Sequence, residues 1–267
     1  MSMNNAKYYY GWPKSGSNWS SIADIFAAHE SVNSAKTSSI PLFSFWRPSG
    51  LSERIRNVNE KYDCISDASK FCFEYAVPVN KDCHGRGKSS MTDLMIFSRR
   101  HVIAIEGKYT ECRQSYQSII KWRGKKAQTG DNKYKVLEGW LKYIQDAQKT
   151  NLKGVDEICE SDIPYQLVHR VASACKAAKD NNQQPVVIYH LFYDECLCEK
   201  KDEFCKMLKH ALYKLKLKNL PFLIMETFVK PSLQQYDRPV DNTIFIEIVN
   251  NASLYEFGET VCDIILQ

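Results

Sequence analysis

Residues 92–108 read TDLMIFSRRHVIAIEGK, in which two apolar runs rich in β-branched residues flank a polar tetrad. The first run is Leu94 to Phe97, the second is Val102 to Ile105, and the tetrad is Ser98-Arg99-Arg100-His101. Such a pattern is typical of two paired strands joined by a tight turn. A turn centred on the tetrad predicts that the two runs face each other residue by residue, from Phe97 and Val102 outward.

The same register places Asp93 opposite Glu106. Facing residues of an antiparallel pair have Cβ atoms about 5 Å apart, and like charges in this position are destabilising. Apolar neighbours predict that the pair is buried, where water cannot screen the repulsion. A hard divalent cation with oxygen ligands would remove the penalty. Lys108 follows Glu106 at a spacing of two and therefore shares its face, while Gly107 carries no side chain.

Asp93 on one strand and Glu106-Gly107-Lys108 on the next resemble the signature of the PD-(D/E)xK nuclease superfamily. Thr92 stands at the position of the superfamily's proline. Over roughly residues 51–195, the resemblance implies a restriction-endonuclease-like α/β fold, with a mixed central sheet flanked by helices on both faces. It implies a Mg²⁺ or Mn²⁺ cofactor, with Asp93 and Glu106 as metal ligands, the main-chain carbonyl of Gly107 as a further ligand, and Lys108 as the residue that positions water.

The string Glu-x-Lys is weak evidence by itself, because Glu199-Lys200-Lys201 repeats it in a charged run with no hairpin before it. The alternative for Asp93 and Glu106 is that they are independent, solvated residues at strand ends. For Lys108 the alternative is an ordinary surface lysine. The hairpin context distinguishes these interpretations.

Outside the hairpin, strands are expected to alternate with helices, which favours α/β layers. Residues 1–50 are expected to form an aromatic and serine-rich N-terminal arm or small subdomain, and residues 51–267 the nuclease-like domain. Further strands are expected at residues 70–79, 185–193, 222–229 and 243–249, and helices at residues 21–29, 52–62, 112–126, 134–149, 165–179 and about 204–215.

Two of these helices carry additional candidate site residues. In the resembled superfamily the first core helix often adds an acidic residue near the metal, and helix 52–62 offers Glu53 and Glu60, between which spacing does not choose. Helix 165–179 is similar to a helix of bacterial members of the superfamily. It places Gln166, His169 and Arg170 on one face as candidate cleft residues. A surface or purely structural role is the alternative for His169.

The net charge of +5 is unevenly distributed. Residues 112–135 contain seven basic side chains and one acidic side chain, with Tyr116 and Trp122 among them. A basic segment with aromatic residues beside a metal site suits a phosphate backbone, although a solvated helix face would look similar. The candidate contacts to nucleic acid are Lys88, Arg113, Lys121, Arg123, Lys125 and Lys126.

Composition excludes several classes of protein. Hydrophobic residues make up 44% and charged residues 25% of the chain, as in ordinary globular proteins. The first sixteen residues contain no apolar stretch of the kind that directs secretion, and no apolar run of about 18 residues occurs, so neither secretion nor a membrane partner is expected. Ten cysteines without a Cys-x-x-Cys pair are interpreted as reduced thiols of a cytoplasmic protein.

The functional hypothesis from sequence is therefore a Mg²⁺-dependent endonuclease that hydrolyses phosphodiester bonds in DNA, by analogy in restriction, defence or mobile-element biology. Cleavage of both strands would favour a homodimer. The alternative is a catalytically silent nucleic-acid-binding or assembly module on the same fold. A hydrolase of small phosphate esters is less favoured, because the basic charge is spread along the chain.

Overall fold

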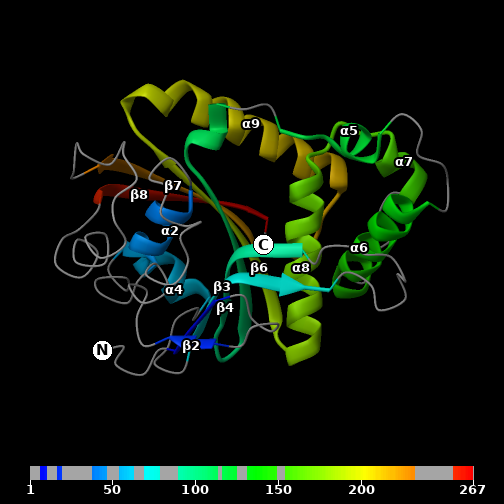
Figure 1. Cartoon of the computed structure of the whole chain (residues 1–267), viewed down its shortest axis with the longest axis horizontal. Coiled ribbons are helices and arrows are strands. Elements are labelled where there is room, and N and C mark those ends of the chain that lie inside the picture. Colours follow the sequence, from blue (N-terminus) through cyan, green and yellow to red (C-terminus); the bar gives the residue numbers. More distant parts are fainter. Residues whose placement is uncertain are drawn as a thin grey trace.

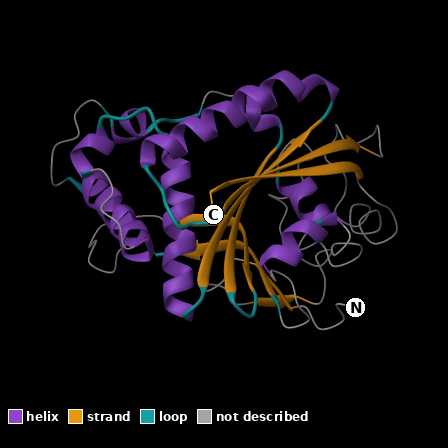
Figure 2. Ribbon diagram, turned by 180° about the vertical axis from the view of Figure 1, so that it is seen from behind, coloured by secondary structure: helices purple, strands orange, loops and turns teal. Residues whose placement is uncertain are grey.

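The computed structural model describes residues 7–10, 17–19, 38–46, 54–62, 69–78, 90–113, 116–124, 131–148, 154–231 and 255–266. Within these residues eight strands form one sheet in the order β2-β1-β3-β4-β5-β6-β7-β8. Helices lie on both faces of this sheet, as Figure 1 and the reverse view in Figure 2 show. The predicted class, α/β with a mixed sheet flanked by helices on both faces, is confirmed.

The strands of the sheet are β1 (Lys7–Tyr10), β2 (Ser17–Trp19), β3 (Lys70–Val77), β4 (Ser90–Phe97), β5 (His101–Lys108), β6 (Gln184–Tyr193), β7 (Phe222–Pro231) and β8 (Tyr255–Leu266). Strand β4 is antiparallel to both of its neighbours, β3 and β5. Strands β5, β6 and β7 run parallel, which requires helical crossovers between them. Strand β8 returns antiparallel to β7, and β1 runs parallel to β3.

The helices are α2 (Ser39–Phe45), α4 (Arg56–Tyr62), α5 (Ile119–Arg123), α6 (Asn132–Gln148), α7 (Val155–Cys159), α8 (Tyr165–Asn181) and α9 (Cys198–Leu215), with short 3-10 turns η2 (Thr110–Arg113) and η3 (Glu195–Leu197). None of the described helices is long and apolar enough to cross a bilayer. The eight cysteines in the described segments are free thiols.

The predicted hairpin register is confirmed over the two apolar runs. Phe97 pairs with Val102, and the ladder continues to Leu94 and Ile105. The backbone N–H of Ser98 donates to the carbonyl of His101 at 3.0 Å, which closes the predicted tetrad turn. The hairpin therefore forms because its period-2 apolar pattern and its polar turn agree on one register.

Each face of the sheet has its own apolar core. One core packs α2 and α4 against the side chains of Ile103 and Ile105, and the other packs α6, α8 and α9 against Ala104. Alternation along β5 therefore turns Glu106 and Lys108 toward α8. On the other face, a Cβ added at Gly107 would lie 3.3 Å from the Leu42 side chain, so glycine lets α2 pack closely on the strand.

One predicted helix, at residues 112–126, is wrong in its extent. Tyr116 and Gln117 are not helical, and α5 covers only Ile119–Arg123. Ser118 has an extended backbone and forms an isolated bridge with Pro164, so the chain is drawn toward the start of α8 instead of continuing a helix. The hydroxyl of Ser118 then accepts a bond from the N–H of Lys121 and caps α5.

Most other predicted helices and strands are confirmed, and the rest fall wholly or partly outside the described residues. Three predicted helices are present, as α6 (predicted at 134–149), α8 (predicted at 165–179) and α9 (predicted at 204–215). Three predicted strands are also present, as β3 (predicted at 70–79), β6 (predicted at 185–193) and β7 (predicted at 222–229). Strand β8 was not expected, because Gly258 and outward-facing polar residues interrupt its apolar pattern. The expected helix at 21–29 and strand at 243–249 lie outside the described residues, and the expected helix 52–62 is described only from residue 54.

A buried chain of hydrogen bonds crosses the sheet from α2 to β8. The indole N–H of Trp46 donates to Nδ1 of His190 at 3.0 Å, and Nε2 of His190 lies 2.9 Å from the Thr227 hydroxyl. The Thr227 hydroxyl lies 2.9 Å from that of Thr260. Because an indole N–H can only donate, Nδ1 must be the acceptor and Nε2 must carry the proton. Burial lowers the pKa of His190 well below its usual value.

We expect Trp46→Phe to destabilise the protein by about 2 kcal/mol, because it leaves a buried imidazole nitrogen without its donor and opens a small void. Urea unfolding measures the change. A loss below about 0.5 kcal/mol, the range of ordinary surface substitutions, would show that this bond does not hold α2 to the sheet.

We also expect stability to fall as the pH is lowered through the ordinary histidine range. The pKa of His190 is lower in the folded than in the unfolded chain, so the unfolded chain binds the proton first and gains stability below about pH 6.5. The loss is at most about 1.4 kcal/mol per pH unit for this group. Proton NMR of the His190 ring checks the cause: titration near pH 6.5 would contradict it.

Candidate functional site

Residues from three elements meet where the hairpin faces α8. Arg170 of α8 donates from Nε to Oε2 of Glu106 at 2.7 Å, and its Nη2 also contacts the same oxygen. Nη2 lies 3.6 Å from Oδ1 of Asp93. The carboxylates of Asp93 and Glu106 therefore lie within reach of one guanidinium. This is the convergence that the hairpin register predicted, although the contacting cation is a side chain of the protein itself.

Lys108 completes the surroundings of Glu106. Its Nζ lies 2.7 Å from Oε1 of Glu106, and both side chains are buried. Burial alone would raise the pKa of Glu106, but the charges and hydrogen bonds of Arg170 and Lys108 outweigh it and lower the pKa. Burial would lower the pKa of Lys108, but Glu106 and Asp93 raise it. Lys108 therefore stays protonated at neutral pH and acts here as a fixed positive charge, not as a base.

Asp93 has a different environment from Glu106. Its side chain is 24% exposed, and its Oδ2 accepts the backbone N–H of Gly107 at 2.9 Å. The strand pairing ends one step earlier, at Leu94 and Ile105, so the side chain of Asp93 takes the place of the next ladder bond. Burial and then repulsion from Glu106 raise the pKa of Asp93. The two carboxyls thus have pKa values shifted in opposite directions.

Glu74 is a third carboxylate at this site, and sequence reasoning missed it. The β3–β4 ladder passes from Phe73 and Leu94 to Tyr75 and Thr92, so Glu74 stands across from Asp93. Its backbone is left-handed, with φ of 49°. Burial raises the pKa of Glu74, with opposing contributions from Arg170 and Glu106 that place it near both. The available signal was a single acidic residue in the apolar run FCFEYAV.

The other candidates divide between the site and its surroundings. Of the trio on α8, Arg170 is in the site, Gln166 is exposed, and the ring of His169 packs on Trp140 with centroids 4.9 Å apart. Burial and the Arg170 charge lower the pKa of His169 to about 3, so it is a neutral packing residue. Glu60 is exposed on α4, the helix that covers the opposite face. Glu53 lies outside the described residues.

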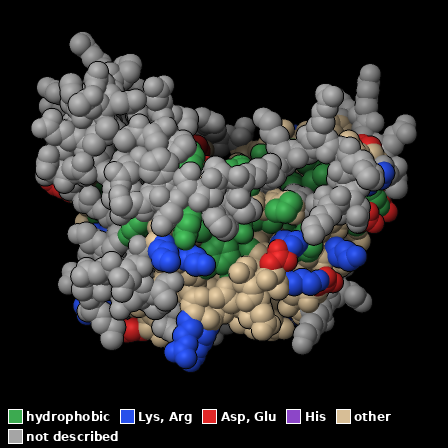
Figure 3. Space-filling model, turned by 60° about the horizontal axis from the view of Figure 1, so that its bottom comes forward, with side chains coloured by type: hydrophobic (Ala, Val, Ile, Leu, Met, Phe, Trp, Pro, Cys, Tyr) green, Lys and Arg blue, Asp and Glu red, His purple; other side chains and the backbone are tan. Residues whose placement is uncertain are grey.

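The predicted contacts to nucleic acid are only partly described. Lys121 is exposed, but Arg123 forms an ion pair of 2.9 Å with Glu160 and its side chain is 12% exposed. Arg113 lies in η2, and its side chain, like residues Lys88, Lys125 and Lys126, lies outside the described part. On the described part of the face in Figure 3, lysine and arginine side chains form separate groups with acidic side chains beside some of them.

Trp122 joins the described part of the basic segment to the start of α8. The ring of Trp122 stacks on Tyr165 with centroids 5.8 Å apart, and Lys133 lies 5.4 Å above the Trp122 ring. Tyr165 begins α8, and Arg170 follows five residues later, which is about 7.5 Å along a helix. The basic segment and the carboxylates therefore occupy neighbouring parts of the same side of the sheet.

The donor chemistry of the site fits a divalent metal ion. Asp93, Glu106 and Glu74 supply the hard oxygen ligands that Mg²⁺ and Mn²⁺ prefer. Gly107 lies in the β5–β6 ladder opposite His190. With Arg170 in its present position, however, the described residues contain no group of three or more metal-binding side chains placed around one point. The three carboxylates have the right ligand atoms for the ion, but Asp93 and Glu106 are arranged around the guanidinium of Arg170.

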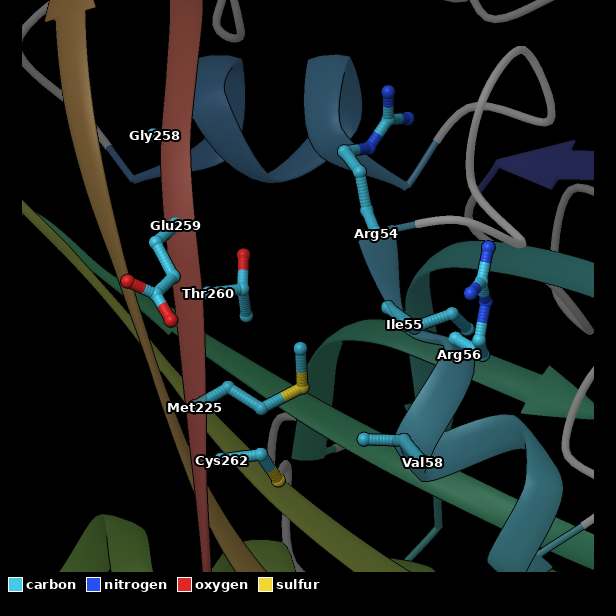
Figure 4. A pocket seen from close by; sticks show the side chains of 9 residues that line it. All are labelled: Arg54, Ile55, Arg56, Val58, Met225, Gly258, Glu259, Thr260 and Cys262. Atoms are coloured by element: carbon cyan, nitrogen blue, oxygen red, sulfur yellow. The ribbon is translucent and has the colours of Figure 1, made fainter.

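A separate cavity of about 380 Å³ lies on the opposite face, between α4 and β8. Figure 4 shows the apolar side chains of Met225, Val58 and Cys262 pointing toward one another, with the side chain of Arg54 directed away from them. Arg54 donates to the carbonyl of Phe45 and lies 5.1 Å from its ring. This cavity contains none of the carboxylates of the candidate site.

We expect the two acids to differ in their effect on stability when no divalent cation is present. Glu106→Gln leaves Arg170 and Lys108 buried without their carboxylate, which costs about 3–5 kcal/mol. Asp93→Asn removes like-charge repulsion and keeps an acceptor for the Gly107 N–H, so its effect stays within about 1 kcal/mol. Urea unfolding in the presence of a chelator measures both. Equal losses would contradict the roles assigned to the two carboxyls.

Comparison with known proteins identifies a family but no activity. The family model of a domain of unknown function, DUF6946, matches residues 16–222, a range that includes Glu74, Asp93, Glu106, Lys108 and Arg170. No curated protein and no solved structure is significantly similar to the chain. By the match over most of its length, the chain belongs to the DUF6946 family.

Proposed function

We propose that this protein is a divalent-cation-dependent nuclease that hydrolyses phosphodiester bonds in DNA, on a fold of the PD-(D/E)xK type. The observation that carries the proposal is the meeting of Asp93 and Glu106 on one face of the hairpin, with Nζ of Lys108 2.7 Å from Glu106. The buried Glu106 and Lys108 and the partly exposed Asp93 have shifted pKa values, which are frequent at active sites.

The order of the elements supports the same assignment. Helix α4 precedes three antiparallel strands, and the helices α5 to α8 lead into the parallel strand β6. This is the order of elements that the resemblance covered. The three strands hold Glu74, Asp93 and Glu106 side by side, and the crossover supplies Arg170. The arrangement therefore accounts for why acids and bases distant in sequence share one site.

Each residue has a defined task in the proposed reaction. Asp93 and Glu106 would hold Mg²⁺ or Mn²⁺, with the Gly107 carbonyl as a further ligand in the proposal. The chemistry that such an ion supplies is neutralisation of phosphate charge and activation of water as a nucleophile. Lys108, protonated and fixed by Glu106, would stabilise negative charge on the phosphate and orient the attacking water through its N–H groups.

DNA is favoured over a small phosphate ester because basic and aromatic residues extend beyond the acids. Lys121 on α5 and Lys133 and Lys135 on α6 are exposed, and Lys133 lies over the Trp122 ring that stacks on Tyr165 at the start of α8. Exposed lysines of this kind can contribute counterion release on a nucleic-acid backbone. We further propose a cytoplasmic enzyme, since its described cysteines are free thiols. A homodimer would allow cleavage of both strands.

A second candidate is a nucleic-acid-binding or assembly module without chemistry. One observation favours it: both carboxylate oxygens of Glu106 already accept from Lys108 and Arg170. The charge of Glu106 is thus balanced without a divalent ion. Calorimetry distinguishes the two, because only the nuclease requires Mg²⁺ or Mn²⁺ binding that depends on Asp93.

We expect the purified protein to cleave DNA in Mg²⁺ or Mn²⁺ and to lose about 100-fold or more of its rate in Asp93→Asn and in Lys108→Met, because each removes charge stabilisation at the phosphate. Plasmid, linear and single-stranded DNA are compared as substrates. Glu106→Ala is a further inactive variant, but its folding must first be verified.

Lys201→Gln is the matched control for loss of a lysine. It removes a largely buried cation that pairs with Glu226 on the α9 side of the sheet, away from the acids of the hairpin. We expect it to cut at the wild-type rate. Cleavage by Asp93→Asn at the wild-type rate would refute the assignment of the site.

A further inference from the structure

We propose that Arg170 is a built-in counter-cation, which occupies the place of the divalent ion between Asp93 and Glu106, and that ion binding moves its guanidinium toward Glu74. This inference rests on the proposed function, since it assumes that Asp93 and Glu106 bind a divalent cation. It assigns roles to Glu74 and Arg170 beyond those of the hairpin residues.

The position of Arg170 carries the first step. Its side chain is 3% exposed, and it contacts both acids through Nη2, with Nε 2.7 Å from Glu106. Arg170 is thus a positive charge held between two carboxylates that would otherwise repel each other. A divalent ion shared by Asp93 and Glu106 would need this same position.

The hydrogen bonds of Glu106 put Arg170 and a divalent ion in competition for the same carboxylate oxygen, Oε2. Oε1 accepts from Lys108, and Oε2 accepts two N–H groups from Arg170. An ion that binds Oε2 must therefore replace the bonds from Arg170. Displacing Arg170 also removes the contact with Asp93, whereas displacing Lys108 would leave the guanidinium between the acids.

Glu74 provides a destination for the displaced charge. Glu74 lies between the two ladder steps, Phe73–Leu94 and Tyr75–Thr92, that flank Asp93, and it interacts electrostatically with Arg170. Nη1 of Arg170 is buried and has no hydrogen-bond partner among the described atoms, so the guanidinium can gain a bond by turning. The bond of 3.0 Å from Nη2 to the carbonyl of Met91 would keep it anchored to β4 during this turn.

The backbone at Glu74 is consistent with a specific role. A left-handed conformation costs a non-glycine residue roughly 1–2 kcal/mol, and Glu74 adopts it in the middle of a strand. Strain of this kind tends to be kept where it places a functional side chain. Here the left-handed backbone takes Glu74 out of the β3–β4 ladder and places its carboxylate near Asp93 and Glu106, the two acids that Arg170 bridges.

The test measures Mn²⁺ binding by calorimetry on the full chain, with no DNA present. The variants are Arg170→Gln, Glu74→Gln and their double variant. Asp93→Asn reports whether the ion binds at the hairpin, and Lys201→Gln controls for loss of a buried cation on another helix. Melting with and without Mn²⁺ is recorded for each, because an ion that binds the folded state raises its stability.

We expect Arg170→Gln to bind Mn²⁺ about tenfold or more tightly than the wild type, because the ion no longer competes with a guanidinium. Glu74→Gln should weaken binding in the wild-type background and have little effect when Arg170 is already replaced. Such non-additivity is the sign of a direct coupling between the two side chains. If Arg170→Gln is unfolded without the ion, refolding by Mn²⁺, followed by circular dichroism, is the supporting result.

Other outcomes overturn the inference and separate it from the proposed function. Weaker or unchanged Mn²⁺ binding by Arg170→Gln, with binding by the wild type that depends on Asp93, would refute the exchange and leave the nuclease proposal standing. If Glu74→Gln weakened Mn²⁺ binding both in the wild type and in Arg170→Gln, Glu74 would be a ligand of the ion and not the partner of the displaced Arg170. Failure of wild type and Arg170→Gln alike to bind Mn²⁺ would remove the premise of both proposals.

Discussion

The burial of Glu106 between Arg170 and Lys108 is the interaction on which the rest of the site depends. A carboxylate with side-chain exposure of 3% is tolerable only when paired and hydrogen-bonded. Meeting this need ties β5 to α8, since Arg170 reaches Glu106 and the carbonyl of Met91 on β4 at once. The crossover helix is therefore bound to the hairpin by polar contacts as well as by its apolar face.

This pairing gives neighbouring acids different properties. Glu106 is held ionised by two cations, whereas burial and repulsion from Glu106 raise the pKa of Asp93, whose contact with the same guanidinium is longer, at 3.6 Å. Two carboxyls whose pKa values are driven apart can take different roles in one reaction. Glu74 adds a third acid to a group in which the cations among the described residues are Arg170 and Lys108, so the charge balance of the group changes when one of these cations moves.

The two faces of the sheet differ in what they carry, since one holds a mainly apolar core and the other holds the carboxylates of the candidate site. On one face, α2 and α4 pack over an apolar core that is crossed by the buried hydrogen-bonded chain from Trp46 through His190 to Thr227. On the other, α8 covers the acids and links them to the ring stack of Trp122 and Tyr165. Gly107 matters to both faces, because it admits α2 on one side and donates its N–H to Asp93.

The sequence alone determined the hairpin, its register and the α/β class, because apolar period and turn chemistry are local properties that neighbouring residues set together. It also named Asp93, Glu106, Lys108 and Arg170 as candidate site residues, and the fold brings these four side chains together. Only the tertiary structure decided that Arg170 bridges the acids, that Glu74 joins them, and that His169 is a neutral packing residue. These depend on which strands become neighbours and which helix face meets them, and on a left-handed backbone at Glu74 that no sequence period reveals. The short extent of α5 has the same origin, since Ser118 and Pro164 are brought together across the fold.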